Sequence, residues 1–269
     1  KTGKVLAHHF GPDPSRPEFS YLKGELADAY GAKVKSFTRS FVFLNLNSSE
    51  VPAALIVFDR VAASDKNFKK FWLLHSVEEP VVSGNTTVVR RAEKGYNGKM
   101  VNRTLLPENR NLLITKIGGA GKEYSVFGKD YPQTFSYPGK NSADSAMWRI
   151  EVSPKTATAT DNFLNVMQVM DDRGPVPLAT TKVETETMVG TRIGDRLVLF
   201  SKDGNLTGGP IRLKIPDNGK VSVLLTDLKN GDWKIQRLRD KKFVSPIESD
   251  DQVLYFSADR GEYLISMAK

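Results

Sequence analysis

The run PIRLKIP, at residues 210–216, places Ile211, Leu213 and Ile215 at every second position and charged side chains between them. A period of two is typical of a β-strand with one face in the core and one face in water, whereas an amphipathic helix repeats about every 3.6 residues. DWKIQRL, at residues 232–238, alternates in the same way. Both runs therefore predict half-buried strands.

Runs of the same kind fill most of the chain. They are rich in Val, Ile, Thr and aromatic residues, which strands favour. The further predicted strands cover residues 40–46, 53–61, 68–77, 85–92, 99–106, 111–118, 122–128, 146–154, 162–170, 182–193, 196–202, 221–228, 252–257 and 262–268. Closely spaced short strands with turn signals between them predict an all-β protein built from antiparallel sheets.

Turn residues and one ambiguous stretch complete this prediction. Lys229-Asn230-Gly231-Asp232 separates two predicted strands with an Asn-Gly turn dipeptide, which predicts a hairpin. FSYLKGELADAY, at residues 19–30, has apolar residues about four apart, but Gly24 lies inside it and weakens a helix by about 1 kcal/mol relative to alanine. One or two helical turns there remain an open alternative.

A linker signal divides the chain in two. DDRGPVPLATT, at residues 171–181, combines two prolines, a glycine and a charge cluster, and the strands after it are shorter and more polar. We therefore expect two segments of antiparallel β structure, at residues 1–175 and 176–269. Each segment is long enough to bury a core of its own.

Composition excludes several classes of protein. The 269 residues are 39% hydrophobic and 26% charged, as in a globular protein and unlike a disordered chain. No apolar run is long enough to span a membrane, and the start, KTGKVLAHHFG, has no apolar signal-peptide core. Cysteine is absent, which excludes disulfides, thiolate zinc sites and cysteine nucleophiles.

The three histidines give no metal or catalytic pattern. His8 and His9 are neighbours and point to opposite faces of an extended chain, so we predict no metal site. His75 is expected to be a hydrogen-bonded structural residue. A nucleophile elbow is absent, and KIGGAGKEY, at residues 116–124, matches no phosphate-binding loop and predicts a hairpin loop. The acidic residues single out no catalytic pair, so no catalytic residue is predicted.

The charge of the chain is informative because it is uneven. The formal net charge is +8, and residues 1–130 hold 20 Lys and Arg against 13 Asp and Glu. Such an excess attracts polyanions. Basic and aromatic residues interleave in part of this half and predict a groove for sulfated or uronic-acid sugars, in which arginine forks take the anions and aromatic faces stack on rings. The predicted substrate-binding residues are Lys69, Lys70, Trp72, Arg90, Arg91 and Tyr96.

Alternatives to this groove remain open. Lysine and arginine also decorate the solvent faces of ordinary strands. No recognition helix, RNA-binding motif or zinc finger is found, so nucleic acid is not expected as a partner.

Three elements in order resemble a known family. YLKGELADAY (21–30), VFDRV (57–61) and FWLLH (71–75), with the chain between them, resemble the region that follows the catalytic part in the heparinase II/III family of polysaccharide lyases, and most of all its heparinase II branch. The resemblance is strong over residues 1–175 and looser beyond them.

The resemblance implies an architecture and a parent protein. Family members have an N-terminal α/α toroid, then a large antiparallel β-sandwich, then a smaller C-terminal β domain, and they cleave uronic-acid polysaccharides such as heparin and heparan sulfate by β-elimination. In the family an H-G-H element and an A-H-N element hold zinc. Neither is present here, and LAHH at residues 6–9 matches neither, so no catalytic or metal-binding residue is transferred.

These implications lead to a functional hypothesis with two rivals. The chain is expected to be the C-terminal portion of a bacterial periplasmic or secreted lyase, inactive alone, without a cofactor of its own, and partnered by the toroid and by acidic polysaccharide; zinc would belong to the full-length parent. One rival is a self-standing carbohydrate-binding β-sandwich. The other is a purely structural domain that packs on the toroid.

Overall fold

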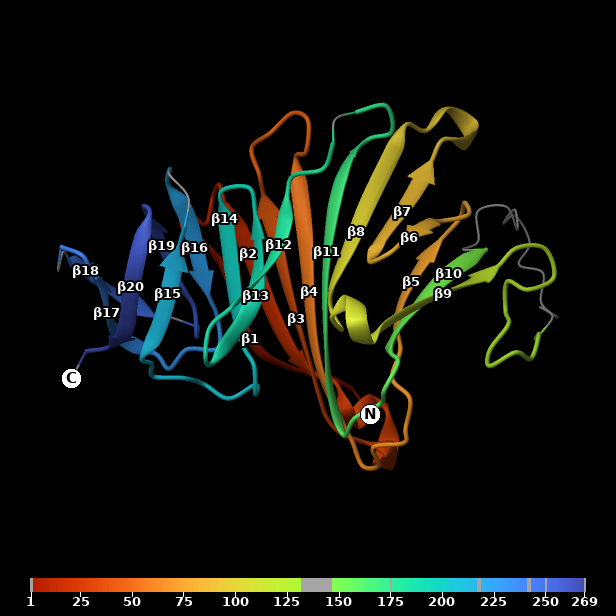
Figure 1. The fold of residues 1–269 in the computed structure, drawn as a ribbon, viewed down its shortest axis with the longest axis horizontal. Coiled ribbons are helices and arrows are strands. Elements are labelled where there is room, and N and C mark those ends of the chain that lie inside the picture. The colour runs from red at the N-terminus through yellow and green to blue at the C-terminus, as the bar shows by residue number, and fades with distance from the viewer. Residues whose placement is uncertain are drawn as a thin grey trace. The chain divides into compact units, whose positions relative to one another are not determined.

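The computed structural model describes residues 2–131, 147–174, 176–216, 219–240, 243–249 and 251–268, and these are almost entirely strands and turns (Figure 1). The strands are β1 (Lys4–Gly11), β2 (Phe19–Glu25), β3 (Val34–Asn45), β4 (Ala53–Ala63), β5 (Trp72–Ser76), β6 (Val81–Ser83), β7 (Thr86–Arg91), β8 (Gly98–Leu106), β9 (Leu112–Gly118), β10 (Trp148–Pro154), β11 (Thr160–Asp171), β12 (Thr180–Glu184), β13 (Met188–Ile193), β14 (Arg196–Ser201), β15 (Ile211–Ile215), β16 (Val221–Leu225), β17 (Gly231–Arg237), β18 (Phe243–Ser249), β19 (Leu254–Ala258) and β20 (Gly261–Met267). Single 3-10 turns are η1 (Ala27–Ala29), η2 (Gly31–Lys33), η3 (Glu93–Gly95) and η4 (Asn109–Asn111). In this described part of the chain, no helix has the length and apolar character needed to cross a membrane.

The strands form four sheets, which confirms the all-β prediction. The largest has eight strands in the order β1-β2-β3-β4-β11-β8-β7-β6, and a three-stranded sheet has the order β5-β10-β9. The other two have the orders β12-β13-β14-β16-β19 and β15-β20-β17-β18. Pairing is antiparallel as expected, with one difference: β14 and β16 run parallel, with Leu197 opposite Val223.

The chain groups into two compact units by its internal contacts. Unit 1 comprises residues 1–29, 37–43 and 178–269, and unit 2 comprises residues 30–36 and 44–177. The chain passes from one grouping to the other between Pro177 and Leu178, inside the predicted linker. The division into domains at residues 1–175 and 176–269 stays a prediction, because a grouping by contacts does not test whether either segment folds alone.

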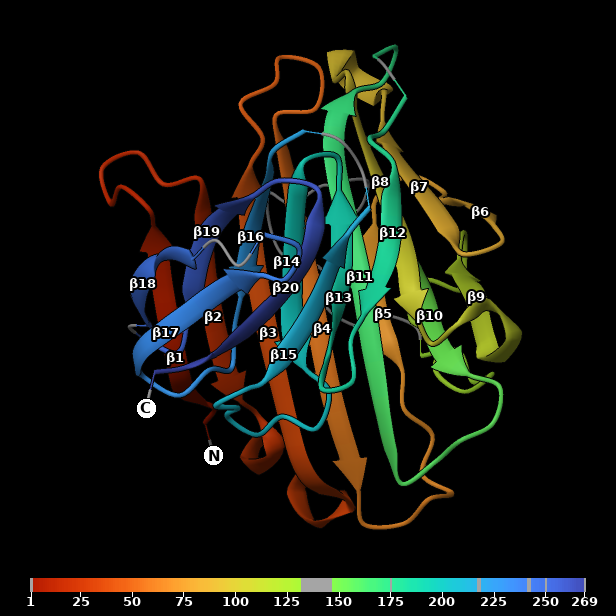
Figure 2. The same cartoon turned by 60° about the vertical axis from the view of Figure 1, so that its left-hand side comes forward.

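Unit 1 holds the two C-terminal sheets around a shared apolar core. Figure 2 shows β15, β20 and β17 side by side, as their pairing requires. Alternate residues of both sheets point into one cluster, which includes Leu199 of β14, Leu213 of β15 and Trp233 of β17. The Trp233 indole N–H donates to the carbonyl oxygen of Lys229 at 3.0 Å, so its polar edge is satisfied in the core.

A buried ion pair joins the β1–β2 hairpin to the C-terminal strands within unit 1. Lys23 of β2 donates through Nζ to Oδ1 of Asp227, in the turn after β16, at 2.6 Å, and both side chains are at most 5% exposed. The Tyr21 hydroxyl donates to the same oxygen at 3.5 Å, and the backbone N–H of Ser201 donates to Oδ2 at 3.0 Å. The carboxylate therefore has three donors in place of water.

A second contact joins the same parts of unit 1. The Tyr255 hydroxyl, on β19, donates to Oε2 of Glu18 at 2.6 Å, and the Phe19 ring lies 5.0 Å from the Tyr255 ring. Burial, followed by the bond to Glu18, raises the pKa of Tyr255 to about 12. The N-terminal hairpin is thus packed as part of the C-terminal unit.

Unit 2 contains β4, β11, β8, β7 and β6 together with the three-stranded sheet. Its buried apolar residues include Ile56 of β4, Leu164 of β11 and Ile150 of β10, all inaccessible to solvent. Asn102 and Thr104 of β8 are buried beside Asn165 of β11, whose Oδ1 accepts from both side chains at 3.3 and 2.7 Å. Apolar packing and side-chain hydrogen bonds therefore both hold the central strands of the unit together.

Some predicted elements were wrong. Residues 19–25 form β2 rather than helical turns, because Phe19, Tyr21 and Lys23 are buried at a period of two, and only Ala27–Ala29 makes a 3-10 turn. Residues 122–128 form turns, not a strand, with an isolated bridge between Val126 and Lys129. The predicted strand at 182–193 is two strands joined by a turn at residues 185–187.

The turn at residues 229–232 does not make the predicted hairpin. Strand β16 before it pairs with β14 and β19, while β17 after it pairs with β18 and β20. The turn therefore carries the chain from one sheet of unit 1 to the other. Ala146, the first residue of the strand predicted at 146–154, lies outside the described residues, and the rest of that prediction matches β10.

Candidate functional site

The end of β7 and the turn after it bring part of the predicted basic site together. Strand β7 pairs with β8 up to Arg91 opposite Gly98, and η3 closes the connection, with Gly95 at φ 82°. This turn returns Tyr96 toward the strand, and the Arg91 guanidinium lies 5.0 Å from the Tyr96 ring centre. Tyr96 is 58% exposed, so its ring remains open to a sugar face.

Carboxylates balance much of this charge. Arg90 donates through Nε to Oδ1 of Asp172 at 2.8 Å, and Arg91 lies 4.0 Å from a carboxylate oxygen of Glu78. The same Glu78 oxygen accepts the backbone N–H groups of residues 92 and 93 at 2.9 and 3.1 Å. The Arg90 side chain is 44% exposed, so its pair with Asp172 is weak and Arg90 could exchange that carboxylate for an anionic group of a ligand. Arg91 and Glu78 are only 25% and 18% exposed, so Arg91 is less accessible.

The other predicted site residues lie elsewhere in unit 2. Lys69 is exposed, whereas Lys70 is 8% exposed and ion-paired with Asp161 at 2.7 Å. Trp72, at the start of β5, is 5% exposed and belongs to the core. Lys70 and Trp72 are therefore closed to a polysaccharide in this structure. Substrate binding by Lys69, Arg90, Arg91 and Tyr96 stays a prediction.

His75 differs from its expected role. It is exposed on β5 opposite Arg149 of β10, and the described residues provide no hydrogen-bond partner for its ring. Partial burial, and then the charge of Arg149, lower the pKa of His75, so the imidazole is neutral near pH 7. Arg149 is itself held by Glu151 at 2.8 Å and by the Ser125 carbonyl oxygen, so its charge is already balanced.

The histidines at the start of the chain lie on β1. His8 is exposed and His9 is half-buried, 3.7 Å from Asp251, as expected for neighbours that point to opposite faces. Among the residues that the structure describes, no three His, Cys, Asp or Glu side chains converge as metal ligands.

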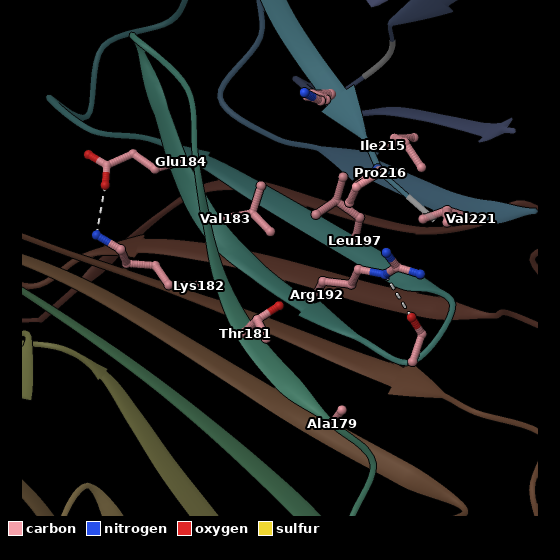
Figure 3. A pocket seen from close by; sticks show the side chains of 12 residues that line it. Ala179, Thr181, Lys182, Val183, Glu184, Arg192, Leu197, Ile215, Pro216 and Val221 are labelled. Atoms are coloured by element: carbon pink, nitrogen blue, oxygen red, sulfur yellow. Dashed lines mark hydrogen bonds and ion pairs between the residues drawn. The ribbon is translucent and has the colours of Figure 1, made fainter. Parts of the chain in front are cut away.

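A groove of about 580 Å³ opens in unit 1 between β12 and the end of β15 (Figure 3). Val183, Leu197, Ile215, Pro216 and Val221 give it an apolar floor. These strands are the first members of their sheets in strand order, so both are edge strands among the described residues. Such a groove suits the apolar face of a ligand.

Charged groups at the rim of this groove are satisfied locally. Lys182 donates to Glu184 at 2.7 Å, and Arg192 donates through Nε to the Gly194 carbonyl oxygen at 2.9 Å, both drawn as dashed lines in Figure 3. The hydrogen bonds of Lys182 and then Lys202 lower the pKa of the Glu184 carboxyl. Sequence patterns did not reveal this groove, because they show which strands exist but not which become edges.

Strands β12–β20 form two sheets around one apolar core. In a comparison with known protein families, residues 182–267, about a third of the chain, match the model of the heparinase II C-terminal domain. The match agrees with the predicted resemblance to heparinase II, and it lies in the part of the chain where that resemblance was expected to be looser.

A comparison with solved structures finds partial matches at low identity. Two crystal structures of heparan sulfate lyase HepC from Pedobacter heparinus, one of them a mutant, are similar with TM-scores of 0.44 and 0.45 and identities of 13% and 14%, the mutant having the higher values. Each similarity covers 71% of this chain but only 26% (mutant) or 27% of the other, so the chain spans about a quarter of their length. No curated protein matches the chain.

Proposed function

We propose that the chain is the C-terminal β portion of a heparinase II/III-like polysaccharide lyase, which acts by β-elimination on uronic-acid polysaccharides such as heparin and heparan sulfate. The match of residues 182–267 to the heparinase II C-terminal domain carries this proposal. The all-β architecture is consistent with it, because the resemblance implies β structure after the catalytic toroid.

The role proposed for this portion is to support the substrate and the toroid, not to perform the chemistry. β-Elimination needs a positioned base, a group that neutralises the carboxylate and an acid for the leaving oxygen. The nearest combination among the described residues is His75 beside Arg149, and Arg149 is occupied by Glu151. The exposed Tyr96 ring beside Arg91, with exposed Arg90 next to it in the chain, is better suited to holding a sulfated or carboxylated sugar.

The proposal extends to the whole parent protein. It would be bacterial and periplasmic or secreted, where extracellular polysaccharides are met, with an α/α toroid as the partner of this chain. Zinc, where present, would be held by the parent outside this chain.

Two measurements on the purified chain test the proposal. After incubation with heparan sulfate, the ultraviolet absorbance of an unsaturated uronate product should not appear. Formation of that product at enzyme-like rates would contradict the proposal that the chain alone has no lyase activity. Heparin affinity chromatography should retain the chain in a salt-sensitive way. Absence of retention on heparin would favour a purely structural domain. Retention, together with a natural gene that encodes no toroid upstream of this chain, would favour the self-standing carbohydrate-binding module.

A further inference from the structure

A second groove in unit 1, on the four-stranded sheet, has not been assigned a role. It measures about 1170 Å³ and adjoins a smaller hollow of about 250 Å³. Together they are lined by five cations and three carboxylates: Arg212, Lys214, Arg237, Arg239, Arg260, Asp240, Asp259 and Glu262. The larger volume exceeds the roughly 300–1,000 Å³ of usual small-ligand pockets, which favours an extended ligand.

The alternation of β15 aims two of these cations outward. Ile211, Leu213 and Ile215 are buried, so Arg212 and Lys214 both lie on the solvent face, about 7 Å apart along the strand. The Lys214 ammonium is 3.9 Å from Glu262, and both side chains are more than 60% exposed. A pair this long and this exposed contributes little, so Lys214 is free to turn toward an anion.

Arg237 is held in place at the other side of the groove. It donates through Nε to Oδ1 of Asp240 at 3.1 Å and through Nη2 to Oδ2, which makes a two-point fork. Its aliphatic stem lies over Gly261, where an added Cβ would come within 3.0 Å of it. Arg237 thereby occupies the Asp240 carboxylate, which could otherwise neutralise the neighbouring residue Arg239.

Two arginines are left with uncompensated charge. Arg212 and Arg239 are exposed, and neither pairs with a carboxylate among the residues that the structure describes. A free guanidinium binds sulfate or carboxylate through two parallel hydrogen bonds, which neither water nor a lysine reproduces. The smaller hollow, with Arg212, and the larger groove, with Arg239, thus each offer a guanidinium that can bind an anion through two hydrogen bonds.

We propose that this groove binds a linear anionic polysaccharide, with Arg212 and Arg239 taking sulfate or carboxylate groups and Lys214 supporting the chain between them. The inference rests on the proposed function and deepens it, since it places a polysaccharide site on the segment that matches the heparinase II C-terminal domain. Single-stranded nucleic acid fits less well, because it needs exposed aromatic rings for base stacking. The aromatic residue among the lining side chains is Tyr263, and it is 3% exposed.

The test compares matched double variants of the full chain by titration calorimetry with a defined heparin oligosaccharide. Arg212→Ala/Arg239→Ala should bind about tenfold more weakly than the unmodified chain, as expected for two lost charged contacts. Lys4→Ala/Arg16→Ala removes the same charge from exposed positions of unit 1 outside the groove and should bind as the unmodified chain does. Arg90→Ala/Arg91→Ala serves as a third variant, on unit 2.

The outcomes separate this inference from the proposed function. Unchanged affinity in the groove variant, with loss only in Arg90→Ala/Arg91→Ala, would overturn the groove site and leave heparin binding by the chain intact. An equal loss of heparin affinity in Arg212→Ala/Arg239→Ala and in Lys4→Ala/Arg16→Ala would mean that only the net charge matters, and it would also overturn the groove site. A single-stranded DNA of similar length that binds more tightly, and through the same arginines, would replace the polysaccharide as ligand. Failure of the unmodified chain to bind would count against the proposed function itself.

Discussion

The Asp227 carboxylate is inaccessible to water and depends on the protein for its solvation. Asp227→Asn keeps the shape of the side chain and tolerates the φ of 60° found there, but it leaves the Lys23 ammonium buried without a counter-charge. Removing one partner of a buried pair costs about 3–5 kcal/mol. We expect a loss of about 3 kcal/mol in the free energy of unfolding, measured by urea denaturation, and partial recovery in Lys23→Met/Asp227→Asn.

An exposed pair in the same unit is the matched control. Glu184 lies 2.7 Å from Lys202, and both side chains are at least 31% exposed. Glu184→Gln should cost less than about 1 kcal/mol, because water solvates the remaining charge. Equal losses at Asp227 and Glu184 would show that burial of the Lys23–Asp227 pair has no special cost.

Tyr255 makes the stability of unit 1 depend on alkaline pH. Its pKa is about 12 in the folded chain and near 10 when unfolded, so the neutral form stabilises the fold fully below pH 10. This contribution is lost as the pH rises from 10 through 12. We expect Tyr255→Phe to be less stable than the unmodified chain at pH 8 and to lose less stability between pH 10 and 12 in urea titrations. Parallel loss in both proteins would contradict the assignment.

At the scale of elements, Gly190 fixes how closely β13 approaches β14. A Cβ at this position would lie 1.9 Å from the Val198 carbonyl oxygen and 2.9 Å from Cα of Leu199, both backbone atoms that cannot move aside. Gly190→Ala should therefore cost at least about 2–3 kcal/mol in the free energy of unfolding.

Gly98 provides the control for this substitution. It is also a strand glycine, at the start of β8, but a Cβ there would meet no heavy atom within 4 Å. Gly98→Ala should change the stability by no more than about 0.5 kcal/mol in the same denaturation experiment. A small effect at Gly190 would mean that the two strands separate readily.

Strand positions were predictable from the sequence where one face of the strand is buried and the other is exposed to solvent. β15 and β17 alternate cleanly, and both were found within a residue or two. Which strands pair was harder to predict from the sequence. Asn230-Gly231 has the turn chemistry of a hairpin even though the strands on its two sides do not pair with each other. β2 shows the converse difficulty: Lys23 is buried at a strand position, and its partner Asp227 is 204 residues away, so local sequence gave no reason to expect it inside.

Some candidate site residues were predictable from the local sequence and others were not. Exposure of Arg90 and Tyr96 follows from local turn chemistry, and the sequence suggested both. Burial of Trp72 and Lys70 depends on which sheet covers them, and the pattern of basic residues carries no such information. Arg212 and Arg239 were missed because the charge excess lies in the first half of the chain, although the alternation of PIRLKIP already placed Arg212 and Lys214 on one face.

At the scale of the whole molecule, the N-terminal hairpin should be necessary for the C-terminal unit. A chain that begins at Tyr30 would lack Phe19 and Tyr21, which are at most 3% exposed, and would leave Asp227 unpaired. We expect the unfolding midpoint of unit 1 to fall markedly, measured by Trp233 fluorescence in a background in which Trp72 and Trp148 of unit 2 are replaced by Phe. Phe10→Ala, at a 49% exposed position of the same hairpin, should leave the midpoint nearly unchanged. An unaltered midpoint in the shortened chain would show that residues 37–43 and 178–269 form the unit without the hairpin.

The discontinuous make-up of unit 1 has a consequence during translation. Residues 30–177 lie between the hairpin and the last segment of the unit, and a ribosome adds about 5–20 residues per second. The hairpin therefore leaves the ribosome roughly 7–30 s before the last segment of the unit begins to appear. Throughout that interval Phe19 and Tyr21 face the solvent as candidate ligands for chaperones, so the yield of native protein should depend on elongation speed through unit 2.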